Sequence, residues 1–270
     1  MEKITDAEFV RIRDFIKAKY GIKMNDEKKP LIYSRLRTVL AEGGFKTFTQ
    51  YFDHLINDKS GETLNNFVNR VTTNHTFFMR ETEHFDFLRD TVLPYLEETY
   101  SHQKEVRLWC AGCSTGEEPN VLQMILQDYF ENKSWDTNIL ATDISSNALD
   151  RAMHSVYPDS RVAALPESWR KKYFRKFDNG NYIVADRIKN NITYRRFNLM
   201  ESIYPFKKKI HVIFCRNVMI YFDDFARKHV AEKFYDIVDE GGYIFIGHSE
   251  SLRHTDINYK YVIPAVYRKM

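Results

Sequence analysis

The chain has 270 residues, enough for one large or two ordinary domains, and its hydrophobic content of 43% supports a full core. It has no run of 18 apolar residues and begins with a charged stretch, so we expect neither membrane insertion nor a secretion signal. The net charge is only +3, and three cysteines are too few for a disulfide framework, which favours the reducing cytoplasm.

Residues 1–70 have the pattern of a small helical bundle. Thr5 and Glu8 have the spacing of a capping box, and Gly21 ends the helix that follows. Apolar residues at helical spacing predict further helices within 30–42, 48–56 and 64–71. This segment holds 13 Lys and Arg against 10 Asp and Glu, and Arg35 and Arg37 flank the apolar face of its second helix. The basic excess indicates an acidic partner, with a merely solvated face as the alternative.

Residues 72–80, with the sequence TTNHTFFMR, interrupt the helical pattern. One interpretation is an interdomain linker with its phenylalanines buried. The other is a segment that lies over a ligand site, where Arg80 could pair with a carboxylate. Helical spacing resumes at 85–96, and we expect Pro94 to kink or split that helix.

The stretch 106–126 predicts a strand, a glycine loop and a helix. A short apolar run ends at Cys110, small residues follow between Gly112 and Gly116, and an apolar helical stripe begins at Val121. This order is that of the first half of a nucleotide-type βαβ unit. Cys110 and Cys113 form a C-x-x-C pair, but no second pair completes a zinc site, so a metal or redox role is the minor alternative.

The glycine loop lacks the signatures of phosphate binding. Its glycines do not fit G-x-G-x-x-G, and Glu117 follows Gly116 where a P-loop has lysine. Glu117 and Glu118 would repel a pyrophosphate but suit a ligand with hydroxyl groups and a positive charge, such as S-adenosylmethionine. A charged first helical turn, favoured by the helix dipole, is the alternative explanation.

Strand and helix patterns continue to alternate after this loop. Apolar runs predict strands at 138–143, 192–197, 210–214, 243–247 and 259–267, and helical spacing predicts helices at 148–153 and 226–238. Asp143 ends the second strand, where a carboxylate commonly holds ribose hydroxyls, although it could instead cap the next helix. Arg216 and Asn217 follow the strand at 210–214, at the edge where α/β sheets bind ligands. We therefore predict an α/β fold with one sheet of about seven strands.

Residues 155–190 do not fit this alternation. A turn signal at 178–181 lies between short apolar runs and predicts a hairpin. Nine Lys and Arg against two Asp and Glu lie between 170 and 196. We interpret this region as a small basic β insertion, either a partner-binding surface or a charged excursion.

Several motifs resemble those of the CheR-type chemotaxis receptor methyltransferases. They are the segment 72–80, the loop at 114–120, Thr142-Asp143, the octapeptide C-R-N-V-M-I-Y-F at 215–222 and G-H-S-E at 247–250. The loop reads S-T-G-E-E-P-N, with Asn120 where the family usually has tyrosine. The similarity spans nearly the whole chain, and the octapeptide is highly specific. It implies a Rossmann-like methyltransferase sheet that follows a helical domain.

The resemblance also implies a domain organisation and a set of site residues. It implies a receptor-docking domain at 1–71, a linker over the cofactor site at 72–95 and a methyltransferase domain at 96–270. The implied contacts to S-adenosylmethionine are Asn74, Thr76, Arg80, Glu117, Asp143, Asn198, Leu199, Arg216 and Asn217. Arg80 would hold the methionyl carboxylate or steer the substrate, Tyr221 would border the methyl path, and no metal is expected.

The implied reaction transfers a methyl group to glutamate side chains of chemotaxis receptors. A cytoplasmic helical receptor domain is then the expected partner of a monomeric enzyme, with Arg35 and Arg37 as docking contacts. Two other functions stay open at this point. A nucleic-acid methyltransferase would use the basic insertion and bind nucleic acid with steep salt dependence, whereas a non-catalytic adaptor would bind the cofactor without transfer.

Overall fold

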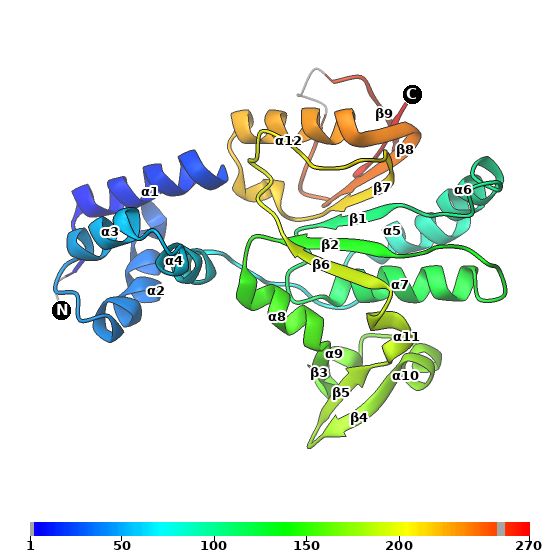
Figure 1. The fold of residues 1–270 in the computed structure, drawn as a ribbon, viewed down its shortest axis with the longest axis horizontal. Helices are drawn as coiled ribbons and strands as arrows, with labels where there is room; N and C mark the ends of the chain where they lie inside the picture. Colours follow the sequence, from blue (N-terminus) through cyan, green and yellow to red (C-terminus); the bar gives the residue numbers. More distant parts are fainter. Residues whose placement is uncertain (1–2, 253–256) are drawn as a thin grey trace.

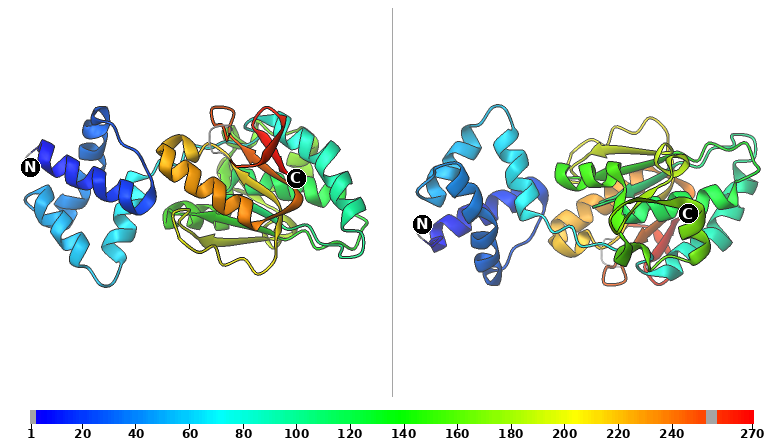
Figure 2. Two further views of the ribbon diagram at one scale, coloured as in Figure 1. Left: turned by 90° about the horizontal axis from the view of Figure 1, so that it is seen from above. Right: turned by 90° about the horizontal axis from the view of Figure 1, so that it is seen from below.

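The computed structural model describes residues 3–252 and 257–270 (Figure 1). A helical domain and an α/β domain lie side by side (Figures 1 and 2). None of the helices in the described part of the chain combines the length and apolar character that crossing a bilayer requires.

The predicted helical bundle is confirmed. Its helices are α1 (Asp6–Tyr20), α2 (Lys29–Glu42), α3 (Phe48–Asn57) and α4 (Glu62–Val71). The capping box also forms: the Glu8 N–H donates to the Thr5 hydroxyl oxygen, and the Thr5 N–H donates to the Glu8 carboxylate. The apolar residues at helical spacing, among them Ile16, Leu36 and Phe67, form a separate core within this domain.

The main sheet confirms the α/β prediction. Over residues 3–252 and 257–270 it has seven strands in the order β6-β2-β1-β7-β8-β10-β9. The strands are β1 (Leu108–Ala111), β2 (Ile139–Asp143), β6 (Ile192–Arg196), β7 (Ile210–Cys215), β8 (Val238–Ile246), β9 (Tyr259–Ile263) and β10 (Val266–Lys269). Strand β1 pairs in parallel with both β2 and β7, and β7 is buried along its whole length, as expected of a central parallel strand. Because the strand order reverses at β1, the carboxyl ends of β1, β2 and β7 form the crevice where such sheets bind ligands.

Helices cover both faces of this sheet. One face packs against α5 (Thr82–Phe87), a π-helical segment (Leu88–Val92), α6 (Leu93–Thr99) and α7 (Glu117–Tyr129). The other packs against α12 (Asp224–Ile237), and Trp109 lies at the centre of that layer. Helix α8 (Ser146–His154) follows β2. The helix predicted around Pro94 is divided by the π-helical segment Leu88–Val92, which lies directly before α6. Pro94 therefore sits in the first turn of α6, where its missing N–H costs little.

The predicted insertion is a separate small sheet with its own helices (Figure 1). It comprises β3 (Val156–Pro158), α9 (Asp159–Val162), α10 (Glu167–Tyr173), β4 (Phe174–Asp178), β5 (Asn181–Val184) and α11 (Asp186–Lys189). Strands β4 and β5 form the predicted antiparallel hairpin. Its turn contains Gly180 with a φ of 87°, a conformation that glycine adopts without strain.

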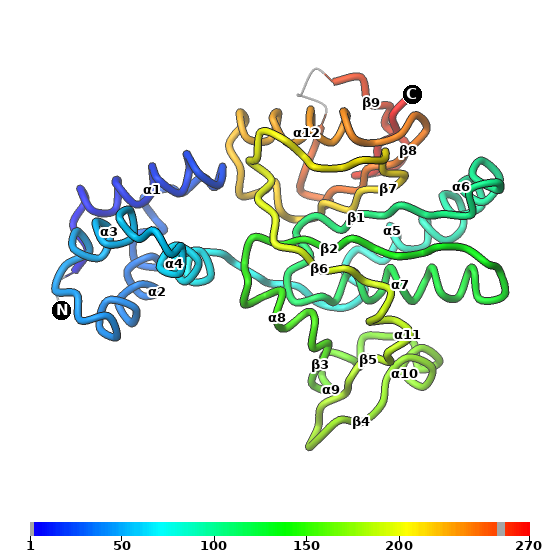
Figure 3. Tube along the Cα trace, viewed as in Figure 1, coloured from blue at the N-terminus to red at the C-terminus, as the bar shows by residue number. Residues whose placement is uncertain are grey.

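Two features differ from the sequence expectations. The single strand predicted at 259–267 is wrong, because the chain turns at Ala265 with a φ of 60° and forms the antiparallel pair β9 and β10. The helix expected at 85–96 forms over residues 82–99 and packs into the main core, so the part of the segment 72–95 that follows residue 81 is not an extended linker. The extended chain between the domains is therefore short, and Figure 3 shows it passing from α4 to α5.

Candidate functional site

A cavity lies between the helical domain and the carboxyl ends of the central strands. Its wall is built from six parts of the chain: residues of the α1–α2 region, the interdomain segment, the glycine loop, the end of β2, the loop after β6 and the loop after β7. Two sets of contacts hold the domains together around it. Ile22 forms an antiparallel β-bridge with Phe222, and Asn69 of α4 exchanges hydrogen bonds with Ser145 and Ser146 at the start of α8. The helical domain is thus one wall of the cavity.

Most of the predicted site residues line this cavity. Those in its wall are Asn74, Thr76, Arg80, Asp143, Asn198, Leu199, Arg216, Asn217, Tyr221 and Arg35. Glu117 and Arg37 are not in its wall. The segment 72–80 lies along the cavity, as the second interpretation of this segment predicted. The first interpretation, a linker with buried phenylalanines, fits Phe78, which is buried, but not Phe77, which is 46% exposed.

The glycine loop folds back against the end of β2. The N–H groups of Gly112 and Cys113 both donate to the Thr142 carbonyl at 2.8 Å. Gly112 has a φ of 93°, and a Cβ there would lie 2.3 Å from Cγ2 of Val218. This close approach requires glycine, and it brings the loop after β1 against the loop after β7 at the edge of the cavity.

Asp143 is a nearly buried carboxylate at the cavity wall. Its Oδ2 accepts the Ser114 N–H at 2.8 Å and its Oδ1 accepts the Ser145 N–H at 2.9 Å. Burial raises the pKa of Asp143, and these backbone N–H groups oppose that rise. A carboxylate has about four acceptor sites, and the N–H groups of Ser114, Ser145 and Ile144 do not use all of them, so Asp143 can still accept a ligand hydroxyl.

The two adjacent glutamates of α7 point in different directions. Glu117 is fully buried, accepts the Thr115 hydroxyl and forms an ion pair with Arg161 of α9. Glu118 lines the cavity, and its Oε2 lies 2.6 Å from Nε of Arg216. Successive residues of an α-helix are about 100° apart, so the two side chains leave the helix in different directions. In the structure Glu118, and not Glu117, is in the cavity wall, and the sequence offered no signal that separates them.

Arg216 is almost fully engaged by protein groups. Besides the ion pair with Glu118, its guanidinium donates to the carbonyl oxygens of Arg80 at 2.6 Å and Glu81 at 3.2 Å. It lies 3.1 Å from Nδ1 of His84. Arg216 thus ties the end of β7 to the segment that carries Arg80, a positioning role that the sequence analysis did not foresee.

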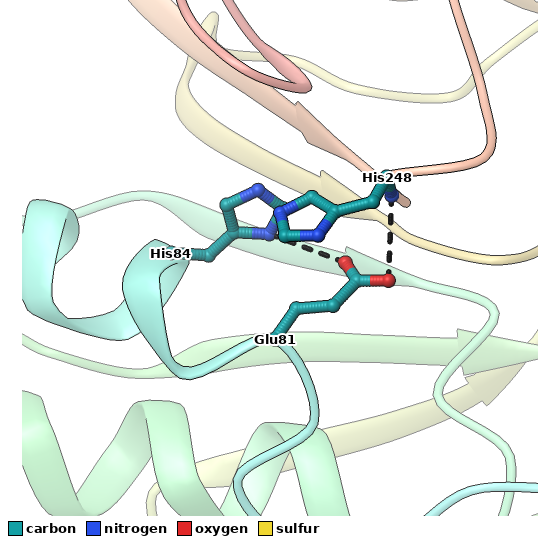
Figure 4. Close-up of side chains that lie close together, drawn as sticks. All are labelled: Glu81, His84 and His248. Carbon is teal, nitrogen blue, oxygen red and sulfur yellow. Dashed lines mark hydrogen bonds and ion pairs between the residues drawn. The ribbon is translucent and has the colours of Figure 1, made fainter.

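Glu81, His84 and His248 form a cluster beside this arginine (Figure 4). Their potential ligand atoms lie within 4.8 Å of one another. However, Arg216 donates to Nδ1 of His84, and Nε2 of His84 lies 3.3 Å from the Pro264 carbonyl. Burial and the Arg216 charge lower the pKa of His84 to about 4, so its ring is neutral. With both ring nitrogens engaged beside a fixed cation, the cluster fits a hydrogen-bonded network better than a metal site.

Cations in the cavity wall differ in how they are bound. Arg35 donates to the carbonyl oxygens of Val71 at 2.7 Å and Thr72 at 3.1 Å, so it fixes the end of α4 instead of facing solvent. Arg80 donates only weakly, to the His75 carbonyl at 3.3 Å, and lies over the Phe77 ring. Within residues 3–252 and 257–270, no carboxylate is paired with Arg80. Its guanidinium is therefore available to an anionic group of a ligand.

Comparison with known proteins finds two matching family models and several similar chemotaxis methyltransferases. Residues 74–266 match the model described as "CheR methyltransferase, SAM binding domain", and residues 7–72 match "CheR methyltransferase, all-alpha domain". A chemotaxis protein methyltransferase of Borreliella burgdorferi is 40% identical, over 98% of this chain and 95% of that protein. A probable chemotaxis protein methyltransferase of Rhizobium etli is 36% identical over 85% of this chain and 87% of its own length. The chemotaxis protein methyltransferase of Escherichia coli is 30% identical over 94% and 87%.

Proposed function

The chain belongs to the CheR methyltransferase family and is an S-adenosylmethionine-dependent methyltransferase, and from this premise we propose that it methylates glutamate side chains of chemotaxis receptors. The product is a glutamyl methyl ester. The observation that carries the proposal is the placement of two cations, Lys28 and Arg80, in the wall of the cavity that also holds Asp143. Among the described residues neither cation is paired with a carboxylate, so an acidic substrate can supply the missing partner.

The cavity residues fit the methyl donor. In this proposal Asp143 accepts a ribose hydroxyl, and Glu118, which is paired with Arg216, faces the cationic end of the donor. When bound, S-adenosylmethionine supplies a methyl group activated by a sulfonium. The proposed contacts from the other strands and the interdomain segment are Asn74, Thr76, Asn198, Leu199 and Asn217.

The chemistry asks little of the protein beyond placement. A free glutamate has a pKa of about 4.3 and is ionised at neutral pH, so no general base is needed to make it a nucleophile. Correct orientation of two reactants can contribute up to ~7–11 kcal/mol. We assign this placement to Arg80 and Tyr221. Arg80 binds either the methionyl carboxylate of the donor or an acidic group of the receptor, and Tyr221 borders the methyl path.

A labelled-methyl assay tests the function. Purified protein, labelled S-adenosylmethionine and receptor-containing membranes should give a labelled receptor whose label is released by base, as for an ester. Binding of the donor without any transfer would instead indicate an adaptor. Label in RNA or DNA would indicate a nucleic-acid methyltransferase, but ion pairs of Lys172, Arg175 and Lys189 neutralise part of the basic insertion.

We propose that the helical domain, residues 1–71, docks the receptor and that Arg37 contributes to docking. Arg37 is exposed on α2, whereas Arg35 is engaged at the end of α4. Arg37→Glu should raise the KM for receptor without changing the affinity for S-adenosylhomocysteine. Because an exposed ion pair contributes about 0–1 kcal/mol, loss of the pair alone should raise KM up to about fivefold, and repulsion by the new glutamate should add to the rise. Lys59→Glu, an exposed cation of the α3–α4 loop, is the matched control; equal KM values for both variants would count against docking through Arg37.

A further inference from the structure

The Glu250 carboxylate joins two loops behind the cavity wall. Its Oε2 accepts the N–H of Asn217 at 2.9 Å and that of Gly247, and its Oε1 accepts the N–H of Ile220 at 2.9 Å. Glu250 itself does not line the cavity. Burial raises the pKa of Glu250, and the same backbone N–H groups oppose the rise. One side chain therefore satisfies donors of both the loop after β7 and the loop after β8.

These hydrogen bonds hold an unusual backbone conformation. Asn217 has a φ of 59°, in the left-handed region that residues other than glycine seldom adopt. Gly247 is packed so closely against it that a Cβ would lie 2.4 Å from Nδ2 of the Asn217 side chain and 2.9 Å from its backbone nitrogen. The Asn217 side chain donates to Glu81 at 3.2 Å, which links it to the interdomain segment. The left-handed turn at Asn217 is thus fixed from several sides, and Glu250 provides the bond to its backbone.

The same carboxylate also fixes the turn that carries Tyr221. The Ile220 N–H lies in the helical turn Met219–Tyr221, directly before the tyrosine that lines the cavity. On the other side, the Lys23 N–H donates to the Tyr221 carbonyl at 2.7 Å. Contacts from both sides therefore determine where this turn presents its side chain.

We propose that Glu250 is a positioning residue of the methyl-transfer site, which sets Asn217 and Tyr221 in place through their loop. The inference rests on the proposed function, because Asn217 is a proposed cofactor contact and Tyr221 a proposed neighbour of the methyl path. Glu250 acts on the reaction only through these residues. A carboxylate suits the task because each of its oxygens accepts N–H groups from a different direction.

Glu250→Gln tests the role with little change in shape. Glutamine has one carbonyl oxygen, so its amide nitrogen must face an N–H of Asn217 or Ile220. Calorimetry well below the melting temperature should show a dissociation constant for S-adenosylhomocysteine raised at least tenfold, and kcat at saturating donor should also fall. Glu240→Gln is the matched control, because Glu240 lies on β8 with a side chain that is 68% exposed. A merely structural role would lower the melting temperature of Glu250→Gln and leave both constants of the folded protein unchanged.

The outcomes separate this inference from the proposed function. If the natural chain neither binds S-adenosylhomocysteine nor transfers a methyl group, the proposed function fails. If it does both and Glu250→Gln matches it within twofold, only the role of Glu250 is overturned. Hydrogen exchange on the natural chain provides a check that needs no variant: the amides of Asn217 and Ile220 should be protected, and free exchange at both would also overturn the role.

Discussion

Replacement of Arg80 by alanine should abolish methyl transfer while the chain keeps its fold. The guanidinium lines the cavity, makes one long hydrogen bond to the His75 carbonyl and lies over an exposed ring, so its removal takes little from the folded state. A charged group that holds a reactant contributes far more to the reaction, and loss of one such contact costs roughly 10²- to 10³-fold in rate. Near-normal turnover by Arg80→Ala would refute the role.

The same variant can distinguish the two roles of Arg80. If its guanidinium holds the methionyl carboxylate, the dissociation constant for S-adenosylhomocysteine rises with the loss of activity. If it steers the acidic receptor, that constant stays the same and the KM for receptor rises. Arg89→Ala is the matched control, because Arg89 lies on the next helical stretch, outside the cavity, with its side chain 51% exposed. It should keep full activity.

The fold was largely predictable because its strongest signals are local. Continuous apolar runs mark the buried parallel strands, and the capping box at Thr5 and Glu8 marks the start of α1. The pair β9 and β10 was missed because the turn signal of Pro264, inside the predicted strand, was not used. The next residue, Ala265, adopts a left-handed φ where glycine or asparagine is usual. The insertion was found through Gly180, the kind of residue that such a turn requires.

The site was less predictable, because side-chain direction depends on distant contacts. Nothing in Glu117-Glu118 shows which carboxylate faces the cavity; Arg161 and Arg216, far along the chain, decide it. Arg35 has the sequence context of an exposed docking residue, yet the end of α4 captures it. Lys28 has no local motif that reveals its place, and the G-H-S-E motif does not show that Glu250 bonds to the loop after β7. Both placements are found only when the domains and loops are assembled.

Asp143→Asn should weaken binding of S-adenosylhomocysteine by about 10- to 100-fold, since a hydrogen bond to a charged group contributes roughly 1.5–3 kcal/mol. Asparagine keeps one oxygen acceptor and places an N–H₂ where the carboxylate accepts a backbone N–H from Ser114 or Ser145. Calorimetry measures this loss of affinity. Asp150→Asn, on the exposed side of α8, is the matched control and should bind normally.

A ligand without ribose hydroxyls decides whether Asp143 acts by direct contact. The folded variant also loses part of its loop structure, so weaker binding alone does not show what the carboxylate holds. With a 2′,3′-dideoxy analogue of S-adenosylhomocysteine, Asp143→Asn should cost much less than with the natural ligand, because the contact is already missing. An equal loss with both ligands would show that Asp143 only orders the glycine loop, and the assignment of the ribose to the end of β2 would then be wrong. The interaction energy between the Asp143 carboxylate and the ribose hydroxyls is obtained by removing each alone and then both together.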